Sequence, residues 1–216
     1  MKKALVITGA LLTLSSAAMA KTVDLAENYN GVILSIPAIE LENKAAEKKI
    51  NKAIYEKIED AKDFVEKNKA MKMELGSSYK VLRDDDKYLT VYLNCSFYPD
   101  RAAHPSHLSY GMVFDKETGK QLPVSYFVNL PSLYRMRQFV KYGYFELEAV
   151  DGSKLPYSDE TFGLEYISDQ YLLDDNDNIR LLYQRYDLGP YAAGNTYIAI
   201  DKEYVDRHGK VLPKGW

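Results

Sequence analysis

Residues Leu89-Thr90-Val91-Tyr92-Leu93-Asn94-Cys95-Ser96-Phe97 carry an apolar side chain at every second position. Successive side chains of a strand point to opposite faces, so the residues at 89, 91, 93, 95 and 97 share one face. The stretch predicts a strand over about 87–98 with one buried face. Cys95 is the only cysteine, and we interpret it as a small buried apolar filler. A nucleophilic thiol would need a basic neighbour, which the local sequence does not supply.

The sequence before this strand predicts a long helix over 43–69. Apolar side chains recur there at steps of three and four residues, and the opposite face carries Lys and Glu. The apolar stripe comprises Ile50, Ala53 or Ile54, Ile58, Ala61, and Phe64 or Val65. One strand over 31–36, ending at Pro37, precedes the helix. Another over about 78–82 follows it, joined to 87–98 by Asp84-Asp85-Asp86.

The sequence after the central strand continues with short strands and one further helix. A loop carries residues 101–107, a strand covers 110–114, and 115–120 forms a hairpin connection in which Gly119 suits a positive φ. A shorter helix over 130–142 shows an apolar stripe of Leu133, Met136 or Arg137, and Val140. Further strands are predicted over 145–149, 170–173, 179–186 and 196–201, with a loop over 189–194.

Helices that segregate from runs of strands are typical of the α+β class. We therefore predict a mostly antiparallel sheet with one long and one shorter helix packed on it. The length of 216 residues suits one domain. We expect a single domain over 21–216, with an N-terminal part over about 30–125 and a C-terminal part over about 126–208.

The first twenty residues have the pattern of a secretory signal peptide. Met1-Lys2-Lys3 is basic, 4–14 is largely apolar, and Ala18-Met19-Ala20 is a small-x-small site, so we expect cleavage after Ala20. The apolar run is short for a bilayer span. We expect a periplasmic or secreted protein with no membrane span in its mature chain.

The charge balance argues against a nucleic-acid partner. The chain has 28 basic and 31 acidic residues, a net charge of −3. Lys2 and Lys3 would leave with the signal peptide, so the mature chain carries 26 basic and 31 acidic residues and a net charge of −5. Proteins that track phosphates normally show the opposite bias.

Four short motifs in a fixed order resemble the RsiV/PdaC-type family of extracytoplasmic domains. They are Ile50-Asn51, Ala103-His104-Pro105, the segment 114–120 (FDKETGK) and the segment 186–194 (YDLGPYAAG). The likeness covers about 35–205. The family includes the ectodomain of a lysozyme-sensing anti-sigma factor and the non-catalytic region of a peptidoglycan deacetylase. The resemblance implies a two-part α+β ectodomain that works at the cell wall. We find no counterpart of the anti-sigma factor's membrane segment or of the deacetylase domain in these residues, so we expect neither activity to carry over.

On this basis we expect a non-enzymatic binding protein of the cell envelope, which recognises lysozyme or another cell-wall hydrolase. The acidic mature chain would favour a basic partner. One alternative is a binder of glycans or peptidoglycan fragments. Another is a cryptic cell-wall hydrolase, since a pair of carboxylates brought together in space is not readable from sequence. No nucleophile elbow, phosphate loop or dinucleotide fingerprint is present, and we predict no cofactor.

The candidate contact residues are histidines and tyrosines in or beside loops: Tyr98, His104, Pro105, His107, Tyr157 and Tyr191. Tyrosine offers a large rigid surface with a polar tip, which protein interfaces favour. His104 and His107 have a spacing that metal sites use, but zinc needs three or four ligands, so we predict no metal there. Asp174-Asp175-Asn176-Asp177-Asn178 lacks the Gly and Glu of a calcium loop and is interpreted as a polar turn, with weak calcium binding left open.

Overall fold

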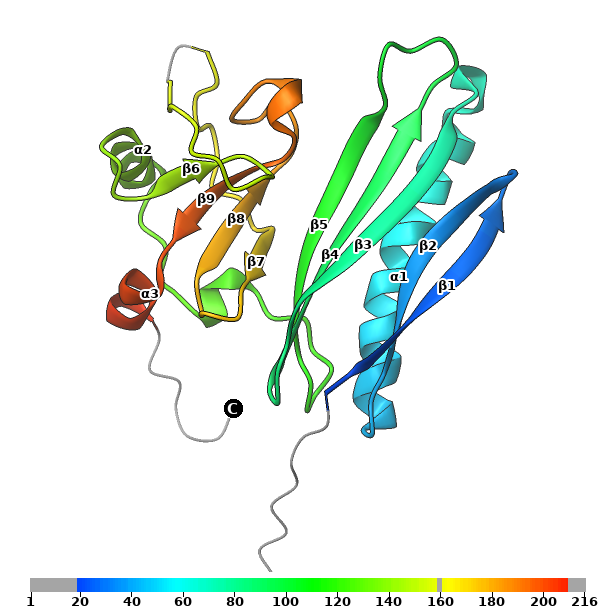
Figure 1. The fold of residues 1–216 in the computed structure, drawn as a ribbon, viewed down its shortest axis with the longest axis horizontal. Helices are drawn as coiled ribbons and strands as arrows, with labels where there is room; N and C mark the ends of the chain where they lie inside the picture. Colours follow the sequence, from blue (N-terminus) through cyan, green and yellow to red (C-terminus); the bar gives the residue numbers. More distant parts are fainter. Residues whose placement is uncertain (1–18, 159–160, 210–216) are drawn as a thin grey trace, which may run out of the picture.

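The computed structural model describes residues 19–158 and 161–209. The predicted signal peptide lies outside this range except for its last two residues. In the described part of the chain, no helix combines the length and the apolar character that a membrane span requires. The strands pair antiparallel throughout, so the predicted α+β class is confirmed (Figure 1).

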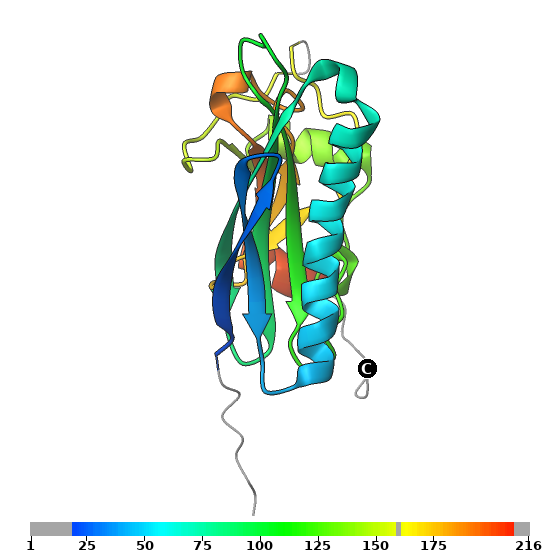
Figure 2. The ribbon, with the colours of Figure 1, turned by 90° about the vertical axis from the view of Figure 1, so that its right-hand side faces the viewer.

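The N-terminal half packs one long helix on five strands. A hairpin of β1 (Lys21–Tyr29) and β2 (Val32–Glu40) lies beside a sheet ordered β3 (Glu74–Asp84), β4 (Tyr88–Tyr98) and β5 (Ser106–Asp115). Helix α1 (Lys44–Lys67) runs along one face of these strands, and a short 3-10 helix, η1 (Lys69–Met71), follows it (Figure 2). The Asn43 side chain caps α1 by accepting from the amides of Ala45 and Ala46.

The core of this half confirms the predicted periodicities. The apolar face of β4, including Cys95, is buried against α1, whose stripe is Ile50, Ile54, Ile58, Ala61 and Val65. Phe64, the alternative to Val65, is half exposed. Cys95 is fully buried in this core, as predicted for a small apolar filler, and burial raises the pKa of its thiol to about 12.

The C-terminal half is a four-stranded sheet with two helices. The strand order is β6 (Glu146–Glu148), β9 (Thr196–Ile200), β8 (Ile179–Tyr183) and β7 (Tyr171–Leu173). Helix α2 (Leu133–Lys141) buries Met136 and Val140 against this sheet, and α3 (Lys202–His208) packs Tyr204 beside them. The 3-10 helices η2 (Val124–Tyr126) and η3 (Tyr191–Ala193) complete the half.

Several predicted elements were wrong in extent or missing. Strand β1 and helix α3 were not predicted. Strand β2 continues through Pro37 to Glu40, because a proline is tolerated in a strand that is hydrogen-bonded on one side only. Strand β3 is longer than 78–82. Strand β5 begins at Ser106, so His107 lies in a strand and not in the predicted loop.

The two halves meet where β5 passes β7. A Cβ atom built on Gly111 would lie 2.1 Å from the carbonyl oxygen of Tyr171, so only glycine allows this approach. The Gln184 side chain binds the free edge of β5 at Ser109, two residues before Gly111. The Ser109 amide donates to Gln184 Oε1 at 2.9 Å, and Gln184 Nε2 donates to the Ser109 carbonyl at 2.8 Å. Gln184 therefore pairs with β5 as a neighbouring strand would.

Two of the four sequence motifs stabilise the packing of the N-terminal half. The Asn51 side chain accepts from the Ile39 amide at 2.7 Å and donates to the Ile39 carbonyl at 2.8 Å, so it ties α1 to β2. In the hairpin after β5, Asp115 accepts from the Thr118 amide and hydroxyl, and Gly119 has φ +69°, as predicted. A Cβ on Gly119 would lie 2.5 Å from the Ala46 carbonyl oxygen. Both motifs are therefore needed for the fold.

Candidate functional site

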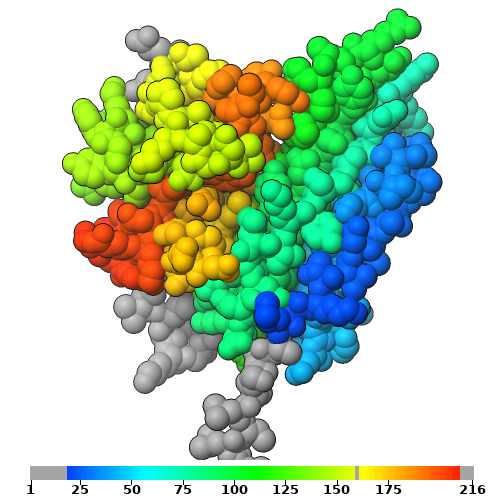
Figure 3. Space-filling view, in the orientation of Figure 1, coloured from blue at the N-terminus to red at the C-terminus, as the bar shows by residue number. Residues whose placement is uncertain are grey.

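The other two motifs meet in space. Ala103-His104-Pro105 lies in the loop between β4 and β5, and the segment 186–194 joins β8 to β9. The rings of His104 and Tyr191 lie 3.9 Å apart between centroids, and the Tyr191 hydroxyl donates to the Pro105 carbonyl at 3.0 Å. The orange surface around 185–194 touches the green β4–β5 loop in Figure 3. The two halves thus build one surface at this end of the molecule.

Tyr186 and Arg185 extend this surface. The Tyr186 ring lies 5.7 Å from the Tyr191 ring and 6.5 Å from His104, and it is 54% exposed. The Arg185 guanidinium carbon lies 4.4 Å from the centroid of the Tyr191 ring, a cation–π geometry. We call His104, His107, Arg185, Tyr186 and Tyr191 together the His–Tyr platform.

The backbone of Tyr186 is strained. Residues 184–187 form a turn in which the Asp187 amide donates to the Gln184 carbonyl at 3.1 Å. Tyr186 is the third residue of this turn and has φ +73°, a conformation that glycine adopts freely and a tyrosine does not. Such strain costs about 1–3 kcal/mol and concentrates at functional sites. An exposed tyrosine therefore stands where the fold alone would prefer glycine.

Within the platform, His107 begins a chain of polar side chains that runs into the contact region between the two halves. Its Nδ1 is 3.3 Å from Asn94 Oδ1, and its Nε2 is 3.5 Å from the Tyr191 hydroxyl. Asn94 accepts from the Ser109 hydroxyl at 2.9 Å. The chain continues through the Tyr92 hydroxyl, 3.1 Å from that of Ser109, to the side-chain amide of Asn195. Burial lowers the pKa of His107, and the charges of Arg185 and His104 lower it further.

We expect the stability of the protein to fall as the pH drops below about 6.5, the ordinary His value, because of His107. Since its pKa is lower in the folded state than in the unfolded state, the unfolded state binds the proton more tightly. The stabilisation is complete above 6.5 and is lost as the pH falls toward the folded pKa. The free energy of unfolding in urea, measured from pH 7.5 to 5, should fall less in His107→Gln than in the wild type. Equal slopes would contradict this assignment.

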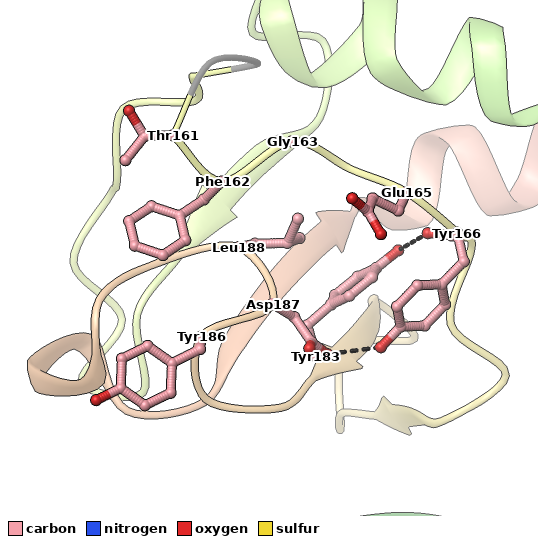
Figure 4. A pocket seen from close by; sticks show the side chains of 9 residues that line it. All are labelled: Thr161, Phe162, Gly163, Glu165, Tyr166, Tyr183, Tyr186, Asp187 and Leu188. Carbon is pink, nitrogen blue, oxygen red and sulfur yellow. Dashed lines mark hydrogen bonds between the residues drawn. The ribbon is translucent and has the colours of Figure 1, made fainter.

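A pocket of about 230 Å³ adjoins the platform and shares Tyr186 with it (Figure 4). Its walls come from 161–166, which sequence analysis did not single out, and from 183–188, which overlaps the motif 186–194. Within it the Tyr166 hydroxyl donates to Asp187 Oδ2 at 2.5 Å, and the buried Tyr183 hydroxyl donates to the Tyr166 carbonyl at 3.2 Å. These bonds fix the positions of the two tyrosine rings.

Of the predicted contact residues, the structure brings His104, Pro105, His107 and Tyr191 together. Tyr98 and Tyr157 have other positions. Tyr98 is the exposed last residue of β4, paired with Glu74 of β3, and the Tyr157 hydroxyl accepts from the Leu164 amide within the C-terminal half. Tyr157 is half-buried against that half's core.

Two segments were considered as metal sites from the sequence: the loop with His104 and His107, and the turn over 174–178. Among residues 19–158 and 161–209, no group of three His, Cys, Asp or Glu side chains is placed to hold an ion. The predicted polar turn over 174–178 is confirmed as the β7–β8 connection. Asp174 accepts there from the amides of Asn176 and Asn178, while Asp177 pairs with Arg83 and Lys202.

Comparisons with known proteins identify relatives of the fold alone. No family model matches the sequence, and no curated protein is significantly similar to it. Two solved structures share its architecture. A member of the DUF3298 family from Bacteroides fragilis is 14% identical with a TM-score of 0.57, over 92% of this chain and 96% of that one. A DUF3298 family protein from Pseudomonas aeruginosa PAO1 is 11% identical with a TM-score of 0.58, over 91% and 96%.

Proposed function

We propose that this chain is a non-enzymatic binding protein of the cell envelope, periplasmic or secreted, whose partner docks on the His–Tyr platform. One observation carries the proposal. Of the four motifs that resemble the RsiV/PdaC-type family, two hold the framework together, while the other two converge on an exposed aromatic surface built by both halves. The strained Tyr186 is the member of that surface that folding does not require.

The composition of the platform suits a protein partner. Tyrosine and arginine are enriched among the few interface residues that carry most of the binding energy. The chain is acidic overall, which favours encounter with a basic protein. The family that the chain resembles includes a lysozyme-binding ectodomain, so a c-type lysozyme, or another basic cell-wall hydrolase, is the first partner to test.

A glycan binder is the second candidate, because exposed aromatic faces such as Tyr186 also stack on sugar rings. The pocket beside the platform contains the carboxylates Glu165 and Asp187, and a paired carboxylate site is what a cryptic hydrolase would need. Muropeptide titrations and a turnover assay on cell walls therefore belong in the same series of experiments. Saturable binding of muropeptides alone would favour the glycan binder, and turnover lost in Glu165→Gln would favour the hydrolase.

Replacing Tyr186 with glycine separates binding from folding. We expect Tyr186→Gly to raise the free energy of unfolding by about 1 kcal/mol, because glycine relieves the positive-φ strain. We expect the same change to weaken lysozyme binding about tenfold or more, the effect of losing a contact worth at least about 1.4 kcal/mol. Calorimetric titration at two salt concentrations, with inhibition of lysis alongside, measures the affinity.

Tyr134→Ala is the matched control, since Tyr134 is a 72% exposed tyrosine on α2. It should leave the affinity unchanged. If the wild type produces neither heat nor protection from lysis, lysozyme is not the partner. If lysozyme binds but Tyr186→Gly binds equally well, the partner docks elsewhere.

A further inference from the structure

The pocket next to the platform is aromatic and acidic, and it carries no positive charge of its own. Its lining comprises Thr161, Phe162, Gly163, Glu165, Tyr166, Tyr183, Tyr186, Asp187 and Leu188. In Figure 4 the side chains of Phe162 and Tyr186 lie on one side, those of Glu165, Tyr166 and Tyr183 on the other, and Leu188 lies between them. The pocket is therefore lined mainly by aromatic side chains, with two carboxylates beside them.

The two carboxylates lack a cationic partner within the described part of the chain. Asp187 accepts hydrogen bonds from the Tyr166 hydroxyl and from the Gln184 amide, both neutral donors. Glu165 is exposed and forms no ion pair or hydrogen bond with a described residue. Asp177, by contrast, forms ion pairs with Arg83 and Lys202. Among the described residues, therefore, no cationic side chain balances the charge of these two carboxylates.

The aromatic walls suit the same kind of ligand. Tyr166 is 47% exposed and Tyr186 is 54% exposed, so both rings offer a face to whatever enters. The face of an aromatic ring attracts a cation, and the attraction grows when the cation loses water. Burial and the bond to Asp187 raise the pKa of Tyr166, so its hydroxyl stays protonated and keeps the ring in place.

We propose that this pocket binds the ammonium or guanidinium group of a lysine or arginine side chain presented by the protein partner. The proposal rests on the proposed function and deepens it, because Tyr186 belongs to both the platform and the pocket. A partner seated on the platform would reach the pocket with one long basic side chain. The apolar stem would lie along the rings while the cationic head lies between Glu165 and Asp187. A neutral sugar would leave both charges unbalanced.

Small probes test the pocket without the partner. The purified protein, labelled with ¹⁵N, is titrated with N-acetyl-arginine amide and, separately, with its neutral isostere N-acetyl-citrulline amide. We expect saturable shifts for residues 162–166 and 183–188 with the arginine compound, and affinity at least about tenfold weaker for the citrulline compound. Glu165→Gln should weaken the binding of the arginine compound several-fold. Asp175→Asn, an exposed carboxylate in the turn at the opposite end of β8, should leave its affinity unchanged.

The outcomes separate this proposal from the proposed function. Equal affinity for both compounds, shifts outside the pocket, or no saturation would each overturn the cation pocket, whatever lysozyme does. If the arginine compound binds as expected but no basic hydrolase binds the platform, the assignment of a cation-binding pocket is supported. The proposal that the partner is a basic hydrolase is then rejected. Muropeptides with a free amine that bind the pocket more tightly than any basic protein would overturn the assignment to a protein side chain.

Discussion

Replacing Gly111 with alanine should lower the free energy of unfolding by at least about 3 kcal/mol. The new Cβ would lie 2.1 Å from the Tyr171 carbonyl oxygen and 2.7 Å from its carbonyl carbon, both backbone atoms of β7. A backbone atom cannot rotate away as a side chain can, so β5 and β7 must separate. Since the Ser109–Gln184 pair lies two residues along β5, we expect the seam between the halves to open with them. Urea unfolding monitored by circular dichroism measures the loss.

Gly76→Ala is the matched control in the same half. Its new Cβ would meet only the Ser96 hydroxyl, at 2.6 Å, and that side chain is free to change rotamer. We expect a cost below about 1 kcal/mol, within the range of an adjusted rotamer. Because the platform is built by both halves, Gly111→Ala should also weaken partner binding, whereas Gly76→Ala should not. Equal destabilisation by the two changes would show that the approach of β5 to β7 is not what requires glycine.

The second large effect is expected at Lys116, just after β5. Its ammonium group is almost fully buried and donates to Asp84 Oδ1 and to the Asp85 carbonyl, both at 2.6 Å. Removing one partner of a buried ion pair leaves an uncompensated charge and costs about 3–5 kcal/mol. We therefore expect Lys116→Ala to destabilise the N-terminal half by about this amount in urea unfolding.

Two comparisons make the Lys116 result interpretable. Lys21 pairs with Glu40 at 3.1 Å, but both side chains are largely exposed, so Lys21→Ala should cost less than about 1 kcal/mol. The double variant Lys116→Met with Asp84→Leu removes both charges and should recover much of the stability lost in Lys116→Ala. If the double variant is as unstable as the single one, the loss comes from packing and not from the unpaired carboxylate.

The local sequence pattern was enough to predict the helix and the strand that bury one face. The alternation of β4 and the three- and four-residue stripe of α1 follow from the geometry of a single strand and a single helix, and both form the N-terminal core. The polar turn over 174–178 and the positive φ of Gly119 are also local and were predicted correctly. The two uncertain positions of the α1 stripe, by contrast, were decided by which side chain faces β4 and its neighbours.

Strand β1 and helix α3 were not predicted from sequence, because both are stabilised mainly by tertiary contacts and not by a local pattern. Most of β1 is exposed, so its sequence shows no clear alternation. It is held on α1 by tertiary pairs, in which Glu27 binds Lys62 and the Tyr55 hydroxyl. Helix α3 has seven residues, too few for a periodic signal, and it packs Tyr204 against Phe145 with ring centroids 4.8 Å apart.

Residue type and position in or beside loops were enough to choose candidate contact residues, and two of them, His104 and Tyr191, do come together. Sequence could not show that Tyr186 lies beside His104, which is 82 positions away, or that His107 belongs to a strand. Nor could it show that Glu165 and Asp187 share a pocket. Periodicity and turn chemistry act over a few residues and therefore fix single elements. Contacts between distant segments depend on how the two halves dock, and the space at Gly111 and the side chain of Gln184 are among the features that determine this docking.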